Sequence, residues 1–310
     1  MNTEMRHGRY FESGRKLFFG YIPVAELRGT WFQMGRQYGA LQKEELVRVL
    51  RFAEKNPESS GRTGSGISGL KRFDEFYRGM AETCGLSFEQ LRTVCSLEPV
   101  RRKPSDGGDP SACAVWGGKT PDGKVLLGRN YDSLPEFAEI LDTLVLTVFH
   151  PADGANAVAM FNWTGCLYLT AGMNETGLSL NLGDGAFADA ESGRIRTGWL
   201  LWEFLLNGND LAALRRGFAA CRPDASCLVG SADKNRAEII DWRADEPSEA
   251  SGAAPNADFP ACAEKYKTDR TLFQIAAVPA EQSWYVKLKG QPEWTEIPLM
   301  NLLKGNGELA

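Results

Sequence analysis

A chain of 310 residues with 43% hydrophobic and 24% charged residues has the size and composition of a soluble globular protein with one large or two ordinary domains. Its net charge of −5 and pI near 5.4 argue against a nucleic-acid-binding surface. No apolar run approaches the roughly 18 residues needed to span a bilayer. We therefore expect a small-molecule partner, with no nucleic acid and no membrane.

The first residues, MNTEMRHGRYFESGRK, lack the apolar region of a secretory signal. This predicts a cytoplasmic protein, or a periplasmic or secreted one if an export signal has been trimmed. The chain has two histidines, His7 in this polar start and His150 before a proline. A Ser-His-Asp or Cys-His site would need one of these two, so the sequence gives little support for a histidine-based mechanism.

The seven cysteines are odd in number and form no C-x-x-C pair, which argues against a zinc knuckle or a thioredoxin motif. Most are expected to be reduced thiols that pack as small hydrophobic side chains. They are Cys84, Cys95, Cys113, Cys166, Cys221, Cys227 and Cys262.

The first third of the chain is predicted to be largely helical, over residues 1–108. A strand-like segment at 20–27 precedes helical spacing of apolar residues over 29–55, and Asn56-Pro57 stops that helix. Residues 57–69 read as a flexible loop. The loop contains GSGISG, which fits G-x-G-x-x-G, but no strand precedes it, so a linker is favoured over a dinucleotide site.

Two more helices are expected at 70–85 and 87–100, the second with Ser87 as N-cap and Gln90 three residues later. Residues 101–112, RRKPSDGGDPSA, are charged and rich in Gly and Pro, which is typical of an exposed loop. A breakpoint therefore lies just before Cys113.

From Cys113 onward the pattern changes to short strands with turn signals. Segments 113–120 and 124–132 flank Pro-Asp-Gly, which predicts a hairpin. A β-meander, two helices broken at Asn-Gly-Asn-Asp with Asn209 or Asp210 as the second N-cap, two strands, a polar loop at 244–260 and a closing hairpin follow. The order predicts an α+β fold with two sheets covered by helices.

Acyl transfer through a cysteine needs a thiolate, a base and an oxyanion site. Because histidine is scarce, the base must come from elsewhere. The α-amino group of the nucleophile itself, with a reference pKa of about 8, can serve near neutral pH if the cysteine begins its chain. Removal of an upstream leader would create that chain start, and the breakpoint before Cys113 fits such a leader.

Cys113 followed by Gly-Arg-Asn-Tyr-Asp at 128–132 resembles the N-terminal-nucleophile (Ntn) hydrolases of the choloylglycine hydrolase and penicillin V acylase type. In that family the catalytic cysteine begins the first hairpin and a G-R-N-x-D run ends its second strand. The turn GMNETGL at 172–178 and the segment DRTLF at 269–273 are also similar to the family's pattern.

The opening LRGTWFQMGRQYGALQKEEL at 27–46 is similar to the acyl-coenzyme A:6-aminopenicillanic acid acyltransferase family, the autoprocessing C45 peptidases. The resemblance implies a four-layer αββα Ntn-hydrolase sandwich with a helical N-terminal pro-segment. It divides the chain into a leader, 1–112, and a catalytic domain, 113–310. It also implies a zymogen that cuts itself between Ala112 and Cys113.

The same resemblance assigns the site residues. Cys113 would be the nucleophile, with its own amino group as base. Arg129 would lie beside the sulfur and favour the thiolate, and Asp132 would orient the amino group. Asn256 would serve the oxyanion hole, and Asn181 would add a polar contact near it, with a register that could slip toward Asp184.

Each assignment has a structural alternative. Arg129 and Asp132 could form an ordinary strand-end ion pair, and Asn256 could be a turn residue. Trp163 fits a substrate pocket and core packing equally well. The residue before the nucleophile is Ala112, where the family more often has glycine or a short polar residue.

The expected function is hydrolysis of a linear amide in an N-acyl substrate through a Cys113 thioester. Alternatives are an acyltransferase that passes the acyl group to an amine, and an uncleaved, non-enzymatic binding protein of the same fold. No metal or organic cofactor is implied. Leader and catalytic chains are expected to remain associated, with homo-oligomerisation left open.

Overall fold

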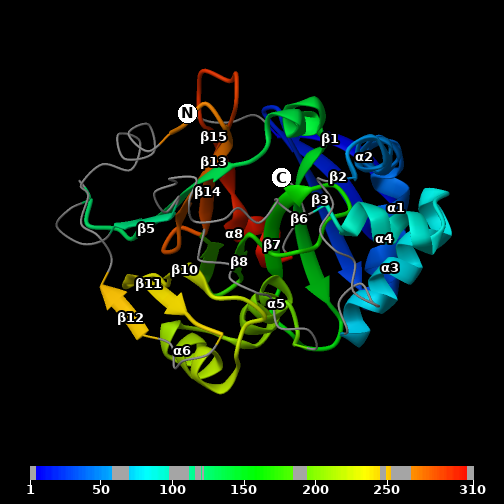
Figure 1. Ribbon diagram of the computed structural model, residues 1–310. Helices are drawn as coiled ribbons and strands as arrows, with labels where there is room; N and C mark the ends of the chain where they lie inside the picture. The colour runs from blue at the N-terminus through cyan, green and yellow to red at the C-terminus, as the bar shows by residue number, and fades with distance from the viewer. Residues whose placement is uncertain are drawn as a thin grey trace.

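The computed structural model (Figure 1) describes most of the chain. The described ranges are 5–57, 70–97, 112–115, 120, 122–183, 194–244, 249–252 and 267–305, with the backbone alone at 112–115 and 249–252. Within these ranges no helix combines the length and the apolar character that crossing a membrane requires.

The strands are short. Those of the first half are β1 (Met5–Phe11), β2 (Gly14–Phe19), β3 (Ile22–Gly29), β4 (Ala112–Val115), β5 (Leu126–Asp132), β6 (Leu144–Pro151) and β7 (Val158–Trp163). Those of the second half are β8 (Ala171–Asn174), β9 (Ser179–Leu182), β10 (Cys227–Ala232), β11 (Ala237–Trp242), β12 (Glu249–Gly252), β13 (Thr271–Val278), β14 (Ser283–Leu288) and β15 (Thr295–Pro298).

The helices fall into two groups along the chain. The first group is α1 (Trp31–Leu41), α2 (Lys43–Lys55), α3 (Lys71–Cys84) and α4 (Phe88–Cys95). The second is the 3₁₀ segment η4 (Pro135–Thr143), α5 (Thr197–Asn207), α6 (Leu211–Ala220) and α8 (Leu299–Leu303).

The described strands form two sheets. The larger has ten strands in the order β1-β2-β3-β6-β7-β8-β9-β10-β11-β12, and the smaller has five in the order β15-β14-β13-β5-β4. Neighbouring strands are antiparallel except β3 and β6, which run parallel. The mixed α/β architecture and the two sheets agree with the sequence pattern.

Helices α1, α3 and α5 lie on one face of the ten-stranded sheet, whereas α8 contacts β6, β7 and β14. Aromatic rings of α1 and α3, Trp31 and Phe73, contact Trp202 of α5 and Phe149 of β6, so these three helices share one apolar layer (Figure 1). The five-stranded sheet covers the other face, where Phe273 contacts Phe161 of β7. The described residues thus form helices, sheet and sheet, and the fourth layer of the predicted sandwich is not among them.

The N-terminal third contains helices where the sequence predicted them, but it begins with two strands, β1 and β2, that the sequence did not predict. β1, β2 and β3 occupy residues 5–29 and extend the ten-stranded sheet beyond β6. The sequence signal was weak because β1 is an edge strand with an exposed Tyr10 and several charges, so it carries no clean alternation of apolar residues. The polar loop predicted at 244–260 likewise contains a strand, β12.

The helix predicted over 29–55 is two helices. The break falls at Gln42, whose backbone dihedrals of −116° and 18° leave the helical region. Gln42 is buried, and its side-chain oxygen accepts a hydrogen bond from Lys16 Nζ at 3.0 Å. A buried lysine needs such partners, so this contact with β2 offsets the cost of interrupting the helix. The predicted stop before Pro57 is confirmed, because α2 ends at Lys55.

Several local predictions are confirmed. Ser87 accepts a hydrogen bond from Gln90 N and the Gln90 side chain returns to Ser87 N, which completes a capping box at α4. Asp210, rather than Asn209, caps α6 by accepting from Ala213 N at 2.7 Å. The closing hairpin is β13 and β14.

Helices α1 and α3 approach closely through glycines on their facing sides. A Cβ atom added to Gly79 would lie 2.0 Å from the carbonyl oxygen of Phe32, and one added to Gly35 would lie 2.0 Å from that of Phe76. Backbone therefore packs directly on backbone, which fixes the crossing of the two helices.

The N-terminal segment shares its core with the rest of the chain. Glu26 of β3 is 1% exposed and binds Arg15 and Arg28, and His150 of β6 lies 3.4 Å from it. Burial alone would raise the pKa of Glu26, but the neighbouring His150, Arg28 and Arg15 outweigh it and lower the pKa. His150 is therefore part of a structural charge cluster.

We predict that Gly79→Ala lowers the free energy of unfolding by about 1–3 kcal/mol, measured by urea denaturation. In an exposed helix the same change would add roughly 1 kcal/mol of stability. A loss of stability would therefore show that the added methyl group clashes with Phe32. Arg78→Ala, at the neighbouring exposed position, should leave stability within about 0.5 kcal/mol. Equal or higher stability of Gly79→Ala would contradict the close approach.

Candidate active site

The hairpin predicted after the breakpoint is present as β4 and β5. Gly123, with a φ of +72°, occupies the turn and donates its N–H to Thr120 O at 3.2 Å. The antiparallel register pairs Ala112 with Arg129 and Cys113 with Gly128. The Ala112–Cys113 peptide bond therefore lies directly across the ladder from the backbone of Gly128 and Arg129.

Arg129 is a buried cation between the two sheets, with 6% of its surface exposed. Its Nη1 donates to the carbonyl oxygen of Thr170 at 2.7 Å. Its guanidinium lies over the ring of Tyr131, 4.9 Å from the ring centroid. A carbonyl and an aromatic face are both attractive to a cation, so these contacts hold the guanidinium in place inside the protein.

Asp132 ends β5 and is held by two threonines. Thr271 Oγ1 donates to its Oδ1 at 2.5 Å, and Thr268 Oγ1 donates to its Oδ2 at 3.0 Å. In the β4–β5 register Asp132 lies four residues beyond Gly128, which corresponds to about 13 Å along a strand. Asp132 is therefore fixed at the start of β13, and the ladder does not bring it beside Cys113.

Asn181 lies in β9 of the larger sheet, close to Arg129. The carbonyl oxygen of Thr170, which accepts the hydrogen bond from Arg129, also accepts one from Leu182 N at 2.8 Å. Asn181 is the residue before Leu182. Asn181 is 3% exposed, and its Nδ2 has no hydrogen-bond partner among the described residues. A buried amide donor without a partner is costly, and such groups are concentrated at functional sites.

The remaining predicted residues are only partly described. Asn256, proposed for the oxyanion hole, lies outside the described residues, as does Asp184. Ala112 and Cys113 are placed by their backbone in β4. The structure thus brings the Cys113 backbone, Arg129 and Asn181 to one region, where β4 and β5 pack against β9 and β10.

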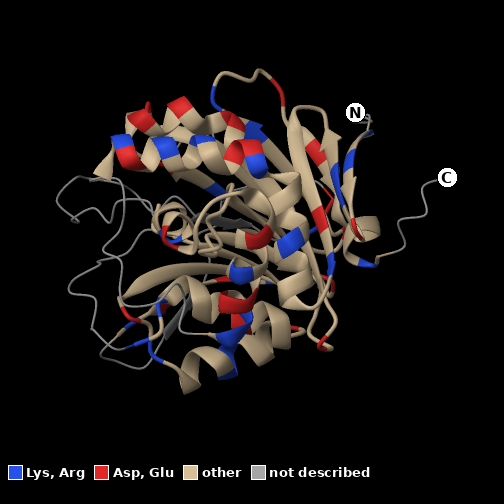
Figure 2. Ribbon diagram, turned by 90° about the vertical axis from the view of Figure 1, so that its right-hand side faces the viewer, with Lys and Arg blue, Asp and Glu red and all other residues tan. Residues whose placement is uncertain are grey.

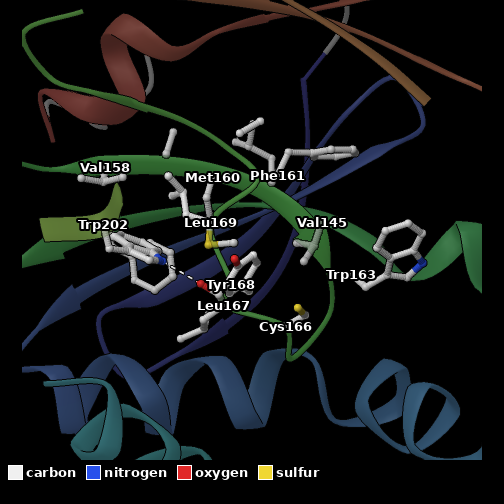
Figure 3. Packing of buried hydrophobic residues seen from close by; sticks show 14 of the residues in the cluster. Val145, Val158, Met160, Phe161, Trp163, Cys166, Leu167, Tyr168, Leu169 and Trp202 are labelled. Atoms are coloured by element: carbon white, nitrogen blue, oxygen red, sulfur yellow. Dashed lines mark hydrogen bonds between the residues drawn. The ribbon is translucent and has the colours of Figure 1, made fainter. Parts of the chain in front are cut away.

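Trp163 is a core residue. It is 2% exposed, and its ring contacts Tyr131, Phe137 and Phe273 at centroid distances of 5.1 to 5.8 Å. Figure 3 shows it at the end of the strand that leads into the buried segment 164–169. Of the two roles considered from the sequence, core packing is the one supported.

Three other described cysteines, Cys84, Cys95 and Cys166, are poor nucleophiles. Burial raises the pKa of Cys95 to about 11 and that of Cys166 to about 12. Burial also raises the pKa of Cys84. These thiols therefore stay protonated at neutral pH, as expected for cysteines that serve as packing groups.

The described part of the chain contains no group of three or more His, Cys, Asp or Glu side chains arranged to hold a metal ion. In Figure 2 residues of both charges are interspersed along the helices and strands.

Several residues of the site region were not identified from the sequence. Thr170 supplies a carbonyl to Arg129 from 41 residues away, so no local pattern predicts it. Tyr131 follows Arg129 by two residues and shares its face of β5, which strand alternation could have indicated. Thr271 faces Asp132 because β13 pairs with β5, a pairing of distant segments.

No protein-family model matches the chain, and no curated protein matches its sequence at the significance required. Among solved structures it is similar to a Caenorhabditis elegans ortholog of N-acylethanolamine-hydrolyzing acid amidase, with 9% identity and a TM-score of 0.42, over 56% of this chain and 93% of that chain.

Two bacterial structures give comparable likenesses. Penicillin V acylase from Agrobacterium tumefaciens matches with 10% identity and a TM-score of 0.43, over 64% of this chain and 89% of that chain. A variant of conjugated bile acid hydrolase from Clostridium perfringens matches with 11% identity and a TM-score of 0.45, over 62% and 92%. TM-scores below 0.5 at such identities do not establish a shared fold, and the proposal below rests on this chain's own residues.

We predict that Asn181→Leu leaves the free energy of unfolding unchanged or raises it by about 1 kcal/mol, because it removes a buried donor without a partner. Asn174→Leu is the matched control. Asn174 is also fully buried, but its Nδ2 donates to Leu205 O and Gly208 O, so its loss should cost about 3 kcal/mol or more. Urea denaturation measures both, and an equal cost for the two variants would contradict the assignment.

Proposed function

We propose that the protein is an autoprocessing cysteine amidohydrolase of the Ntn type that cleaves a linear amide C–N bond in an N-acyl substrate. Cys113 is its nucleophile once the Ala112–Cys113 bond is cut, and the freed amino group of Cys113 is its base. The observation that carries the proposal is the β4–β5 hairpin, which sets the Ala112–Cys113 bond opposite the buried Arg129.

The charge of Arg129 supports this choice of nucleophile. A fixed cation beside a thiol stabilises the thiolate and lowers the thiol pKa. Arg129 is buried and held by Thr170 and Tyr131, so its field is weakly screened by solvent. Cys95 and Cys84 also have a cation nearby, Arg196 and Lys43, but burial outweighs it and raises the pKa of each thiol.

The proposed reaction has two halves. The Cys113 thiolate attacks the amide carbonyl, the C–N bond breaks, and the amine leaves with a proton delivered by the Cys113 ammonium group. The resulting thioester is then attacked by water, which loses its proton to the same amino group, and the carboxylic acid leaves. Asn181 and Asn256 are the proposed amide donors to the developing oxyanion.

Asp132 orients the Cys113 amino group only if removal of Ala112 lets β4 shift along β5 toward Asp132. In the present register both of its oxygens accept from threonines, and its contribution is to fix the start of β13. The leader would remain bound after cleavage, because its strands and helices share the core with the catalytic domain.

Intact-mass spectrometry tests the proposal. We expect the purified protein to appear as two species that meet at Ala112 and Cys113, and Cys113→Ala to stay full length. Incubation with N-acyl amino acids, N-acylethanolamines, penicillin V, acyl-homoserine lactones or conjugated bile acids should add one acyl mass to the 113–310 species for a good substrate. Cys113→Ala should lose turnover by at least about a thousandfold.

Cys221→Ala is the matched control, because Cys221 is a half-buried thiol at the end of α6, and it should process and turn over normally. An added amine that captures the acyl group in place of water would point to the acyltransferase alternative. A single full-length species, with Cys113 unreactive toward every substrate, would overturn the proposal in favour of a binding protein.

A further inference from the structure

The segment between β7 and β8, residues 164–170, is a buried loop without regular secondary structure. Its side chains are nearly inaccessible: Thr164 and Leu169 are 0% exposed, and Tyr168, the most exposed non-glycine residue, is 6% exposed. Figure 3 shows the segment between the larger sheet and the N-terminal helices. Backbone N–H and C=O groups buried in a loop must find partners outside any ladder, so such a loop needs dedicated side chains.

Two tyrosines of the N-terminal helices supply those partners. Tyr38 of α1 accepts a hydrogen bond from Gly165 N at 3.0 Å. Tyr77 of α3 donates its hydroxyl to Gly165 O at 2.9 Å and accepts from Leu167 N at 3.3 Å. Burial, followed by the neighbouring thiols Cys95 and Cys166, raises the pKa of Tyr77 well above its ordinary value, so its proton stays available for donation.

Further side chains close the loop from other elements. Trp202 of α5 donates its Nε1 to Leu167 O at 2.7 Å, the dashed line of Figure 3. Asn162 of β7 donates to Tyr168 O at 2.8 Å. Gly165 has a φ of +86°, and a Cβ atom there would meet the side chain of Val94 at 2.4 Å. The loop is therefore held in one conformation by side chains from four elements.

This loop ends at Thr170, the residue whose carbonyl receives Arg129 at 2.7 Å. The path of residues 164–169 helps to place that carbonyl, together with Leu182 N of β9, which donates to the same oxygen at 2.8 Å. Tyr77 is thus connected to the guanidinium of Arg129 through its hydrogen bonds to Gly165 and Leu167, the backbone of residues 167–170, and the hydrogen bond to Thr170 O.

We infer that Tyr77, assisted by Tyr38, is a positioning residue for Arg129, and that the N-terminal helices thereby set the geometry of the active site. The inference rests on the proposed function of Cys113 and Arg129. It gives residues 1–112 a lasting role in the processed enzyme, because the helices that hold the loop belong to that segment.

Tyr77→Phe tests the inference, because it keeps the ring in the core and removes only the hydroxyl. Gly165 O, Leu167 N and Cys95 Sγ lose their partner, the loop relaxes, and Thr170 O, which Leu182 N still holds, positions Arg129 less precisely. We expect kcat to fall between tenfold and about a hundredfold with KM changed less than about threefold, since small displacements of a catalytic group have effects of this size. The pH profile of Cys113 alkylation by iodoacetamide, followed by peptide mass mapping, should shift to higher pH.

Among the described residues, the other charged groups on the elements packed against β4 are paired with neighbouring side chains. Asp132 on β5 is bound by two threonines. On β11, which packs against β4, Glu238 pairs with Arg215 and Asp241 pairs with Arg243. None of these groups contacts Tyr77 or the loop in the described part of the structure.

Tyr21→Phe is the matched control. The Tyr21 hydroxyl lies 3.2 Å from Glu293 O and 3.4 Å from Val286 O, so this variant loses a comparable hydroxyl contact far from the loop. It should leave the kcat and the pH profile unchanged. If Tyr77→Phe fails to fold, Tyr38→Phe, which removes the acceptor of Gly165 N and the hydroxyl's contacts with Thr164 and Thr147, should give the same shift in smaller measure.

Normal kcat and a normal pH profile in a folded tyrosine variant would overturn the positioning role while the proposed function stands. A wild-type Cys113 that alkylates with the pH profile of a free thiol would instead overturn the proposed function, and the inference with it.

Discussion

The hydrogen bonds that bury the 164–170 loop are the constraint on which the rest of the structure depends. A loop in the core is tolerated only if its backbone groups are satisfied, and here Tyr38, Tyr77 and Trp202 satisfy them. Because each of these side chains comes from a different helix, the loop also fixes how α1, α3 and α5 lie against the larger sheet. The same loop then delivers the Thr170 carbonyl to the face where Arg129 is buried.

This arrangement explains why the N-terminal segment is more than a removable leader. Three of its strands extend the larger sheet, β3 pairs in parallel with β6, and α1 and α3 pack backbone on backbone through Gly35 and Gly79. A cut before Cys113 would free an amino group without separating the two parts. Buried contacts hold the segments before and after Cys113 together, and these contacts do not require an intact Ala112–Cys113 bond.

The sequence predicted features whose causes are local. The capping box at Ser87, the Asp210 cap and the β4–β5 turn each depend on a few neighbouring residues, and all three are present. β1 was missed because it is a polar edge strand. The break at Gln42 was also missed, and the Gln42 side chain contacts Lys16, 26 residues earlier in the chain. Propensity cannot anticipate a contact made across the fold.

The candidate site also combines features with local causes and contacts between distant segments. The hairpin and the placement of Arg129 on it follow from turn and strand signals. The partners that define the environment of Arg129 do not: Thr170 lies 41 residues away, and Tyr77 contacts Gly165 across 88 residues. Such pairs exist only once the sheets and helices have packed, so a sequence pattern can suggest a catalytic residue while leaving its supporting side chains unseen.

Residue-specific hydrogen exchange of the native protein tests the central constraint most directly, through the amide protons of Gly165 and Leu167, whose acceptors are the hydroxyls of Tyr38 and Tyr77. We predict that both amides exchange as slowly as those of the central strands β6 and β7, opening only with global unfolding. Exchange of these two amides at the rate of a surface loop would contradict it, because the loop would then lack the fixed conformation that places Thr170 against Arg129.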